Sequence, residues 1–323
     1  MNSVAMNIAV QQKCKPRFRG QRNMLPKAPL YFPMTMEREY LRIVDRYMML
    51  FYTTLAKQLP VIRKATSGEC KAKIIDLKIR LKIRHDANDI DTDVGYIIEE
   101  VFARIQEDFN QQALLFDLGR RITTLANQTR RLSITQWRRV VRQSLGINIM
   151  EDYYMGEFFR TTLIQWITNN IGLIESAPQS ALTELRNIIQ EGWQSGLSNR
   201  DISRQIQSAY EKYKNKTDFW ARDQMAKLNA DMSEQQQKDA GVEEYVWSTS
   251  GDERVRGNPS GKWPDGDHYQ LDGTRHNWIN PPVVDKRTGR CAHPGKDFNC
   301  RCVALPVFNL PGLSLPWEGG DQD

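Results

Sequence analysis

No stretch of this sequence is apolar over a length sufficient to cross a lipid bilayer. Its opening residues, MNSVAMNIAV, lack the early positive charge and the small-residue cleavage site of a secretion signal. The 323 residues include only five cysteines, two isolated and three clustered, which excludes a disulfide framework and favours reduced thiols. We therefore expect a protein that is made and kept in the cytoplasm and has no membrane partner.

Signatures of catalysis are also sparse. The sequence has no glycine-rich loop to cradle a phosphate, no second acidic cluster and no nucleophile with an evident partner. We expect that the protein is not an enzyme. The alternative is a metal-dependent nuclease, in which a histidine acts as base and an aspartate as metal ligand. The residues available for it are His268, Asp272, His276, Asn277 and His293.

Acidic residues are absent from residues 1–30, which carry several lysines and arginines between prolines. The prolines prevent a long helix, so residues 1–34 should form an extended basic arm. Two further basic segments lie at 71–84 and 120–142. Each segment is consistent with a solvated or ion-paired surface, and also with phosphate contacts that have no sequence preference. The candidates for contact with DNA are Lys13, Lys15, Arg17, Arg19, Arg22, Lys78, Arg80, Lys82, Arg138 and Arg139.

Residues 35–196 show the periodicity of an α-helical domain. Apolar residues at spacings of three and four follow Thr35, an N-cap residue, and we expect this helix to stop at Pro60. A capping box at 133–136 predicts the start of another helix, which should close at Gly146. Further helices are expected at 91–118, 150–170, 178–193, 199–210 and 217–238, the last capped by Thr217.

The last of these helices leads through Gly241 into an expected strand at 242–249. A helix, a glycine turn and a strand in succession indicate an α+β unit. The predicted fold class is therefore α+β, with a mainly α-helical N-terminal region followed by a small, turn-rich α+β domain at 197–308. Residues 309–323 form an acidic tail.

The stretch from Tyr245 to Pro306 differs in composition from the rest of the chain. It holds three of the four histidines and three of the five cysteines, and it is rich in glycine, proline and aspartate. Such a segment cannot be helical. Its backbone must be held by turns, by side-chain hydrogen bonds or by a metal ion.

Several short blocks follow one another in this stretch. A strand ends near Trp247, a D-x-R-x-R block and an H-x-x-L-D-G block come next, and a Pro-Pro pair precedes a final P-G-x-D-x-N-C-R-C block. The residues of these blocks are Trp247, Asp252, Arg254, Arg256, His268, Asp272, Gly273, Pro281, Pro282, Pro294, Gly295, Asn299, Cys300 and Cys302. Together with an A-R-D-Q block at 221–224, the ordered set resembles the Mu F-like, or phage head morphogenesis, domain over residues 197–307.

This resemblance implies a minor capsid protein of a tailed bacteriophage. Such a protein would join the head during procapsid assembly, associate with the portal protein and with the major capsid or scaffold protein, and stay inside the virion. It would also lie against the packaged double-stranded DNA and assist its packaging or ejection. The structural alternative is a head–tail connector component that makes protein contacts alone.

Two interpretations concern how the turn-rich stretch is held. In an extended D-x-R-x-R segment all three charged side chains share one face, so Asp252 could clamp the loop by accepting hydrogen bonds from Arg254 and Arg256. The alternative for this block is that the two arginines bind phosphate. A structural zinc site built from His268, Cys291, Cys300 and Cys302 would do the same with four protein ligands. The alternative to zinc is a set of buried thiols beside a hydrogen-bonded histidine.

Overall fold

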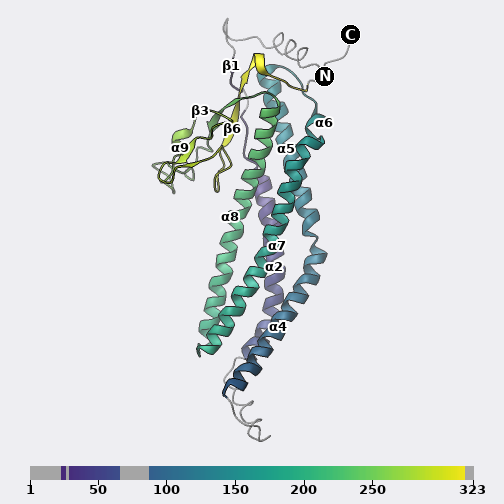
Figure 1. The fold of residues 1–323 in the computed structure, drawn as a ribbon, viewed down its shortest axis with the longest axis vertical. Helices are drawn as coiled ribbons and strands as arrows, with labels where there is room; N and C mark the ends of the chain where they lie inside the picture. The colour runs from purple at the N-terminus through teal and green to yellow at the C-terminus, as the bar shows by residue number, and fades with distance from the viewer. Residues whose placement is uncertain (1–22, 27–28, 66–86, 317–323) are drawn as a thin grey trace. The chain divides into compact units, whose positions relative to one another are not determined.

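The computed structural model describes residues 23–26, 29–65 and 87–316, and it confirms the α+β class (Figure 1). The helices are α2 (Met34–Ala65), α4 (Ala87–Phe116), α5 (Leu118–Leu145), α6 (Glu151–Tyr154), α7 (Glu157–Gln194), α8 (Asn199–Asp239) and α9 (His268–Leu271). A 3-10 turn, η1, covers Leu310–Gly312. In this part of the chain, no helix has an apolar segment suited to spanning a membrane.

Several of the helices are longer than the sequence signals predicted. Pro60 lies inside α2 and Pro178 inside α7, so neither proline ends or begins a helix. An interior proline costs a helix roughly 3 kcal/mol. Apolar residues close to each proline are nevertheless buried, among them Ile62 and Ala177, and this packing holds both helices together.

Two predicted helix caps also lie inside helices. The Ser133 hydroxyl donates to Oε1 of Gln236 (3.2 Å) within the continuous helix α5. The Thr217 hydroxyl donates to the carbonyl of Lys214 (2.8 Å) in the middle of α8. Gly146, by contrast, follows α5 with a φ of +74° and ends it as predicted.

The chain divides into two compact units, and neither is continuous in sequence. The first comprises residues 1–40, 123–168 and 219–323, and the second comprises 41–122 and 169–218. The sequence instead predicted consecutive domains at 35–196 and 197–308. The difference arises because four helices, α2, α5, α7 and α8, each contribute residues to both units.

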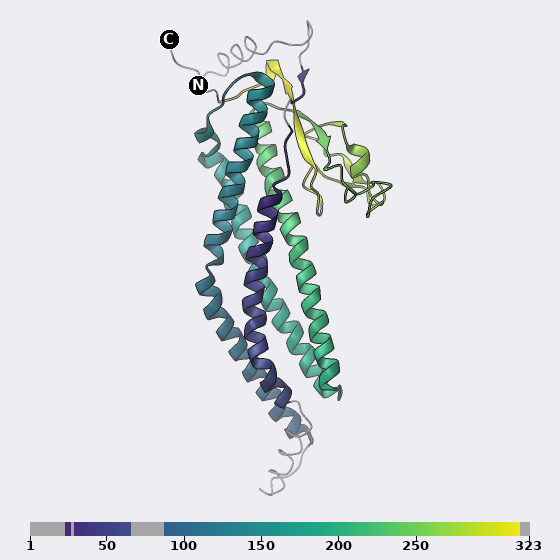
Figure 2. The ribbon, with the colours of Figure 1, turned by 180° about the vertical axis from the view of Figure 1, so that it is seen from behind.

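The second unit is helical, and aromatic residues form much of its core. Tyr47 and Phe51 of α2 contact Phe109 of α4 edge to face, with ring centroids 5.5 and 5.7 Å apart. Tyr52 packs on Tyr210 of α8 at 4.5 Å. The two views show α2 and α4 running side by side here (Figures 1 and 2).

The first unit contains a four-stranded antiparallel sheet in the order β1-β6-β2-β3. Its strands are β1 (Asn23–Met24), β2 (Glu244–Ser248), β3 (Arg275–Asn277) and β6 (Val303–Asn309). A separate pair joins β4 (Val283–Asp285) to β5 (Arg290–Cys291). The strand predicted at 242–249 is thus present as β2, and it pairs along its length with β6.

Two apolar clusters cover this sheet. One contains Trp137 of α5 and Phe308 of β6, whose rings lie 6.0 Å apart. The other contains Tyr245 and Trp247 of β2 together with Cys300 and Cys302. Alternate burial along β2 follows from the two-residue period of a strand, which directs Tyr245 and Trp247 to the same side.

The C-terminal half of α8 lies beside β6 (Figure 2). Gln237 donates to the carbonyl of Ala304 (2.9 Å), and Gly295 lies against the helix. Gly295 has a φ of +81°, and a Cβ there would lie 2.8 Å from Cβ of Ala230 and 3.2 Å from the carbonyl oxygen of Ala226. Only glycine satisfies both the backbone conformation and the close approach.

We expect Gly295→Ala to destabilise the protein by more than Gly289→Ala. Gly289 has a φ of +69° but open space around its Cα, so alanine there incurs only the backbone cost, about 1–2 kcal/mol. Alanine at 295 adds overpacking against α8, about 1–3 kcal/mol more. Urea denaturation of both full-length variants measures the difference, and equal losses would show that the close packing against α8 has no energetic weight.

Candidate functional site

Three of the sequence blocks meet at one hollow in the first unit. Its volume is about 280 Å³, and it is bordered by the D-x-R-x-R loop, by α9 and by the N-C-R-C segment, with one residue from α8. The lining residues are Arg222, Ser250, Asp252, Arg254, Val255, Arg256, Trp263, His268, Phe298, Asn299, Cys300, Arg301 and Cys302. Four arginines around a hollow of this size make it the candidate site in the described residues.

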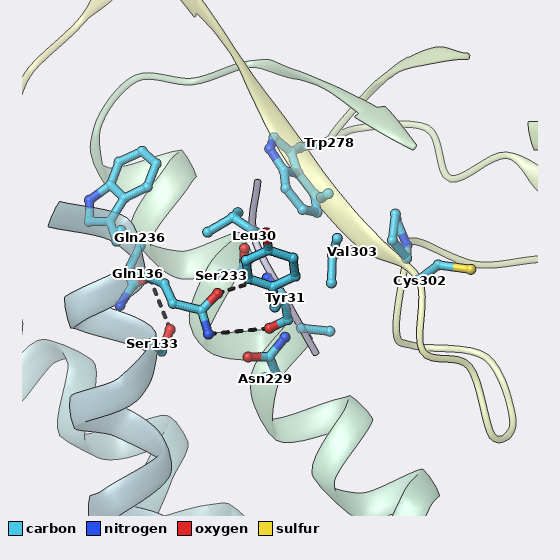
Figure 3. A pocket seen from close by; sticks show the side chains of 14 residues that line it. Leu30, Tyr31, Ser133, Gln136, Asn229, Ser233, Gln236, Trp278, Cys302 and Val303 are labelled. Atoms are coloured by element: carbon cyan, nitrogen blue, oxygen red, sulfur yellow. Dashed lines mark hydrogen bonds between the residues drawn. The ribbon is translucent and has the colours of Figure 1, made fainter. Parts of the chain in front are cut away.

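A smaller cavity lies on another side of Cys302 and has a volume of about 20 Å³, enough for about one water molecule. Its walls are fixed by internal hydrogen bonds (Figure 3). The side-chain amide of Gln136 accepts a hydrogen bond from the backbone amide of Tyr31 (2.8 Å) and donates one to the carbonyl of Tyr31 (3.3 Å). The Ser133 hydroxyl donates to Gln236. This cavity is therefore too small for a ligand.

The N-C-R-C segment owes its course to Asn299. This residue has a φ of +51°, a left-handed conformation that asparagine tolerates better than most residues. The backbone amide of Asn299 donates to the carboxylate of Asp223 in α8 (3.2 Å). Cys300 and Cys302 are then buried, whereas Arg301 forms a bidentate pair with Glu37 of α2, in which Nη2 donates to Oε1 (2.8 Å) and Nε donates to Oε2 (3.2 Å).

The acidic residue at the centre of the site is Asp297, the aspartate of the final block. Its side chain is 1% exposed and accepts hydrogen bonds from Arg256 (2.6 Å) and Arg290 (3.3 Å). Nε2 of His268 lies 2.9 Å from the same carboxylate. Three separate chain segments thus converge on one buried charge.

The clamp predicted at Asp252 is wrong in its third member. Asp252 pairs with Arg254 (3.3 Å) and accepts the Arg254 amide (3.0 Å) in a tight turn, so the backbone is not extended here. Arg256 consequently points away from Asp252 and reaches Asp297. The clamp exists, but its acceptor is a residue 41 positions from Arg256 in sequence.

Electrostatics reinforce the pairing of Asp297 with His268. Burial raises the pKa of Asp297, but the hydrogen bond with His268 and the charge of Arg256 outweigh it and hold the pKa well below its usual range. Burial lowers the pKa of His268, whereas its hydrogen bonds with Asp297 and Cys300 raise it, and the net shift is upward. Asp297 is therefore a carboxylate, and it fixes the orientation of the imidazole.

On its other side the imidazole faces two thiols. Nδ1 of His268 lies 3.5 Å from Sγ of Cys300 and 3.7 Å from Sγ of Cys302. Burial raises the pKa of the Cys300 thiol. Hydrogen bonds with Cys302 and His268 lower this pKa by more than burial raises it, so the net shift is downward. The pKa of the Cys302 thiol is raised, first by its hydrogen bond with Cys300 and then by its burial. Histidine, cysteine, aspartate and glutamate are the side chains that could hold a metal ion. Among the described residues, His268, Cys300 and Cys302 form the one group of three or more of them that is compact enough to do so.

Cys291, the fourth member of the predicted zinc set, lies apart from this cluster. It is exposed on β5, and its thiol faces the carbonyl of Gly289 (3.6 Å). A two-residue strand that pairs with β4 sets this direction. Cys291 is therefore not gathered into one cluster with His268, Cys300 and Cys302.

The residues of the predicted nuclease site are not gathered into one cluster. Asp272 accepts hydrogen bonds from the amide and hydroxyl of Thr249 (2.7 and 3.0 Å), and Gly273, with a φ of +74°, completes the expected turn. The other four residues also have partners elsewhere. His268 pairs with Asp297, His276 with Thr274, Asn277 with the backbone amides of Ile279 and Asn280, and His293 with Tyr245.

Two of the candidates for DNA contact have partners within the protein. Arg138 donates to the carbonyl of Ile149 and pairs with Glu151 (2.8 Å). Arg139 donates to the carbonyl of Pro29 (2.7 Å) and lies over the ring of Tyr31. The candidates outside the described residues are Lys13, Lys15, Arg17, Arg19, Arg22, Lys78, Arg80 and Lys82.

Comparison with known proteins identifies the region that contains the hollow. Residues 183–305 match the model of the family described as Phage Mu protein F like protein, so this region is phage Mu F-like and the resemblance seen in the sequence is confirmed. The match indicates a phage head morphogenesis protein and a place in the virion. Every residue that lines the hollow lies within it.

An uncharacterized protein from Haemophilus influenzae is 35% identical to this chain over 140 residues. The aligned part covers 43% of this chain and 28% of the relative's length. No solved structure matches the chain.

We expect Asp297→Ala to cost about 3–5 kcal/mol of unfolding free energy, because it leaves the charges of Arg256 and Arg290 without their buried partner. Asp252→Ala is the matched control. The Asp252 side chain is 34% exposed and that of Arg254 is 50% exposed. Removal of the ion pair between them should therefore lower the unfolding free energy by less than about 1 kcal/mol. Urea denaturation checks both values, and a larger loss for Asp252→Ala would restore Asp252 as the clamp.

Proposed function

We propose that this protein is a minor capsid protein of a tailed bacteriophage. It joins the head during procapsid assembly, associates with the portal protein, and remains inside the virion. The observation that carries this proposal is the family match over 183–305, which includes the complete Asp297 clamp and every residue lining the hollow. The family match supports a protein of the phage head, and the association with the portal protein and the position inside the head are our additions to it.

The internal bonding of the site favours a structural role over catalysis. The four arginines around the hollow each pair with a carboxylate: Arg222 and Arg301 with Glu37, Arg254 with Asp252, and Arg256 with Asp297. Such a network holds a turn-rich segment in one conformation. In this proposal the network keeps the Mu F-like region rigid.

A second feature that supports a protein partner lies in the helical unit. The consecutive residues Leu114 and Leu115, at the end of α4, are 81% and 86% exposed. Covering two leucine side chains contributes about 1.5–3 kcal/mol each. We propose that this end of α4 contacts a head protein, with the portal protein as the first partner to test.

The leucine pair gives a direct test of that contact. We expect Leu114→Ser with Leu115→Ser to weaken the complex with purified portal protein at least tenfold, which is about 1.4 kcal/mol. Ile279→Ser is the control, since Ile279 is 85% exposed but lies in the Mu F-like region. Biolayer interferometry measures both affinities. Unchanged binding by the double variant with weakened binding by the control would move the contact to the Mu F-like region.

DNA is the second proposed partner, through the basic segments at 13–27 and 71–84. We expect affinity for double-stranded DNA to fall steeply with salt and to show no sequence preference. Replacing Lys78, Arg80 and Lys82 with glutamine should reduce the slope of log affinity against log salt by about 0.9 for each phosphate that the variant no longer neutralises.

Replacement of Arg138 and Arg139 with glutamine is the matched control for the DNA measurement. Both arginines are bonded within the protein, so the control should leave the salt slope nearly unchanged. Fluorescence anisotropy at several salt concentrations gives the slopes. If the wild type does not bind DNA, the protein is better explained as a head–tail connector component with protein contacts alone.

A further inference from the structure

We propose that His268, Cys300 and Cys302 bind a zinc ion as a site with three protein ligands. Tetrahedral zinc, with bonds of about 2.3 Å to sulfur and 2.0–2.1 Å to nitrogen, places neighbouring nitrogen and sulfur ligands roughly 3.6 Å apart. The corresponding separations in this structure are 3.5 and 3.7 Å. All three ligand atoms lie within 4.8 Å of one another, so a single ion can reach all of them.

The surroundings of the three ligands match those of a metal site. Nε2 of His268 bonds to Asp297 (2.9 Å), which leaves Nδ1 facing the two cysteines, and histidine ligands of metals are commonly oriented by a carboxylate in this way. The amide of Gly295 donates to Sγ of Cys300 (3.4 Å). The ring of Trp247 packs edge-on against the imidazole, with centroids 5.6 Å apart, and holds it in place.

The donor set selects the kind of metal. Two thiolates and one imidazole are soft to intermediate ligands, which suit zinc and do not suit magnesium or calcium. Two thiolates also balance the charge of a divalent ion, so the buried cluster carries no net charge. The same three side chains line the hollow of about 280 Å³, which gives a fourth, non-protein ligand such as water room to bind.

The position of the cluster gives the ion a structural task. His268 begins α9, whereas Cys300 and Cys302 precede the start of β6. Between β2 and β6 the described chain has only short elements of two to four residues. An ion bound to His268 and to Cys300 and Cys302 joins the middle of this segment to its end, and its binding energy contributes to folding.

The first measurement is the metal content of the full-length protein, purified without added metal or chelator. We expect about one zinc per chain and a fall in melting temperature after removal of zinc with a chelator. Cobalt substitution should give a thiolate-to-cobalt charge-transfer band with the intensity of two thiolates, and visible bands of a four-coordinate ion. Protein without zinc, and with no such spectrum after cobalt addition, would overturn the proposal.

Variants then assign the ligands. Cys302→Ser should lose the zinc and, with cobalt, the charge-transfer band, whereas the matched variant Cys291→Ser should keep both. A variant with Cys14, Cys70 and Cys291 all replaced by serine should also keep one zinc per chain. Loss of zinc from this triple variant would refute the three-ligand assignment. Rapid alkylation of Cys300 in the zinc-free wild type, with no metal uptake, would instead identify a reactive cysteine–histidine pair.

Discussion

The turn-rich region depends on one buried carboxylate. Asp297 is almost fully removed from solvent, and it remains ionised because cations from the D-x-R-x-R loop and from β5, together with the imidazole of α9, surround it. A buried charge is stable only while its partners are in place, so each of these segments must reach its position for the others to hold. The region therefore has few alternative conformations, even though its strands and its helix are short.

Around this charge, successive residues of the final block have separate roles. Gly295 allows the backbone to approach α8, Asn299 turns the chain through a left-handed conformation, and the two cysteines face the imidazole. Arg301, between the cysteines, points to Glu37 of α2. Because a strand-like segment directs alternate side chains to opposite sides, one short block can complete the buried cluster and also bind a distant helix.

Local signals in the sequence were sufficient for some of this structure. The strand β2, the turn at Gly273 and the end of α5 at Gly146 all follow from residues next to them in the chain. Pro60, Pro178 and Thr217 misled the prediction, because distant apolar contacts override local helix preferences. The sequence brought His268, Cys300 and Cys302 to attention, but it did not separate them from Cys291, whose direction depends on the pairing of β5. Glu37 could not be found, since 264 positions separate it from Arg301 and no local pattern links them.

The strand order β1-β6-β2-β3 has a consequence for the synthesis of the protein. The central strand β6 is made after every other strand of this sheet, and it pairs on one side with β1, which is the first of them. On the ribosome, β2 and the cysteine–histidine cluster must therefore wait for β6 to emerge before the sheet can form. Long-range pairing of this kind folds slowly and exposes unpaired strand edges meanwhile. The chain thus completes its Mu F-like region only after β6 has emerged.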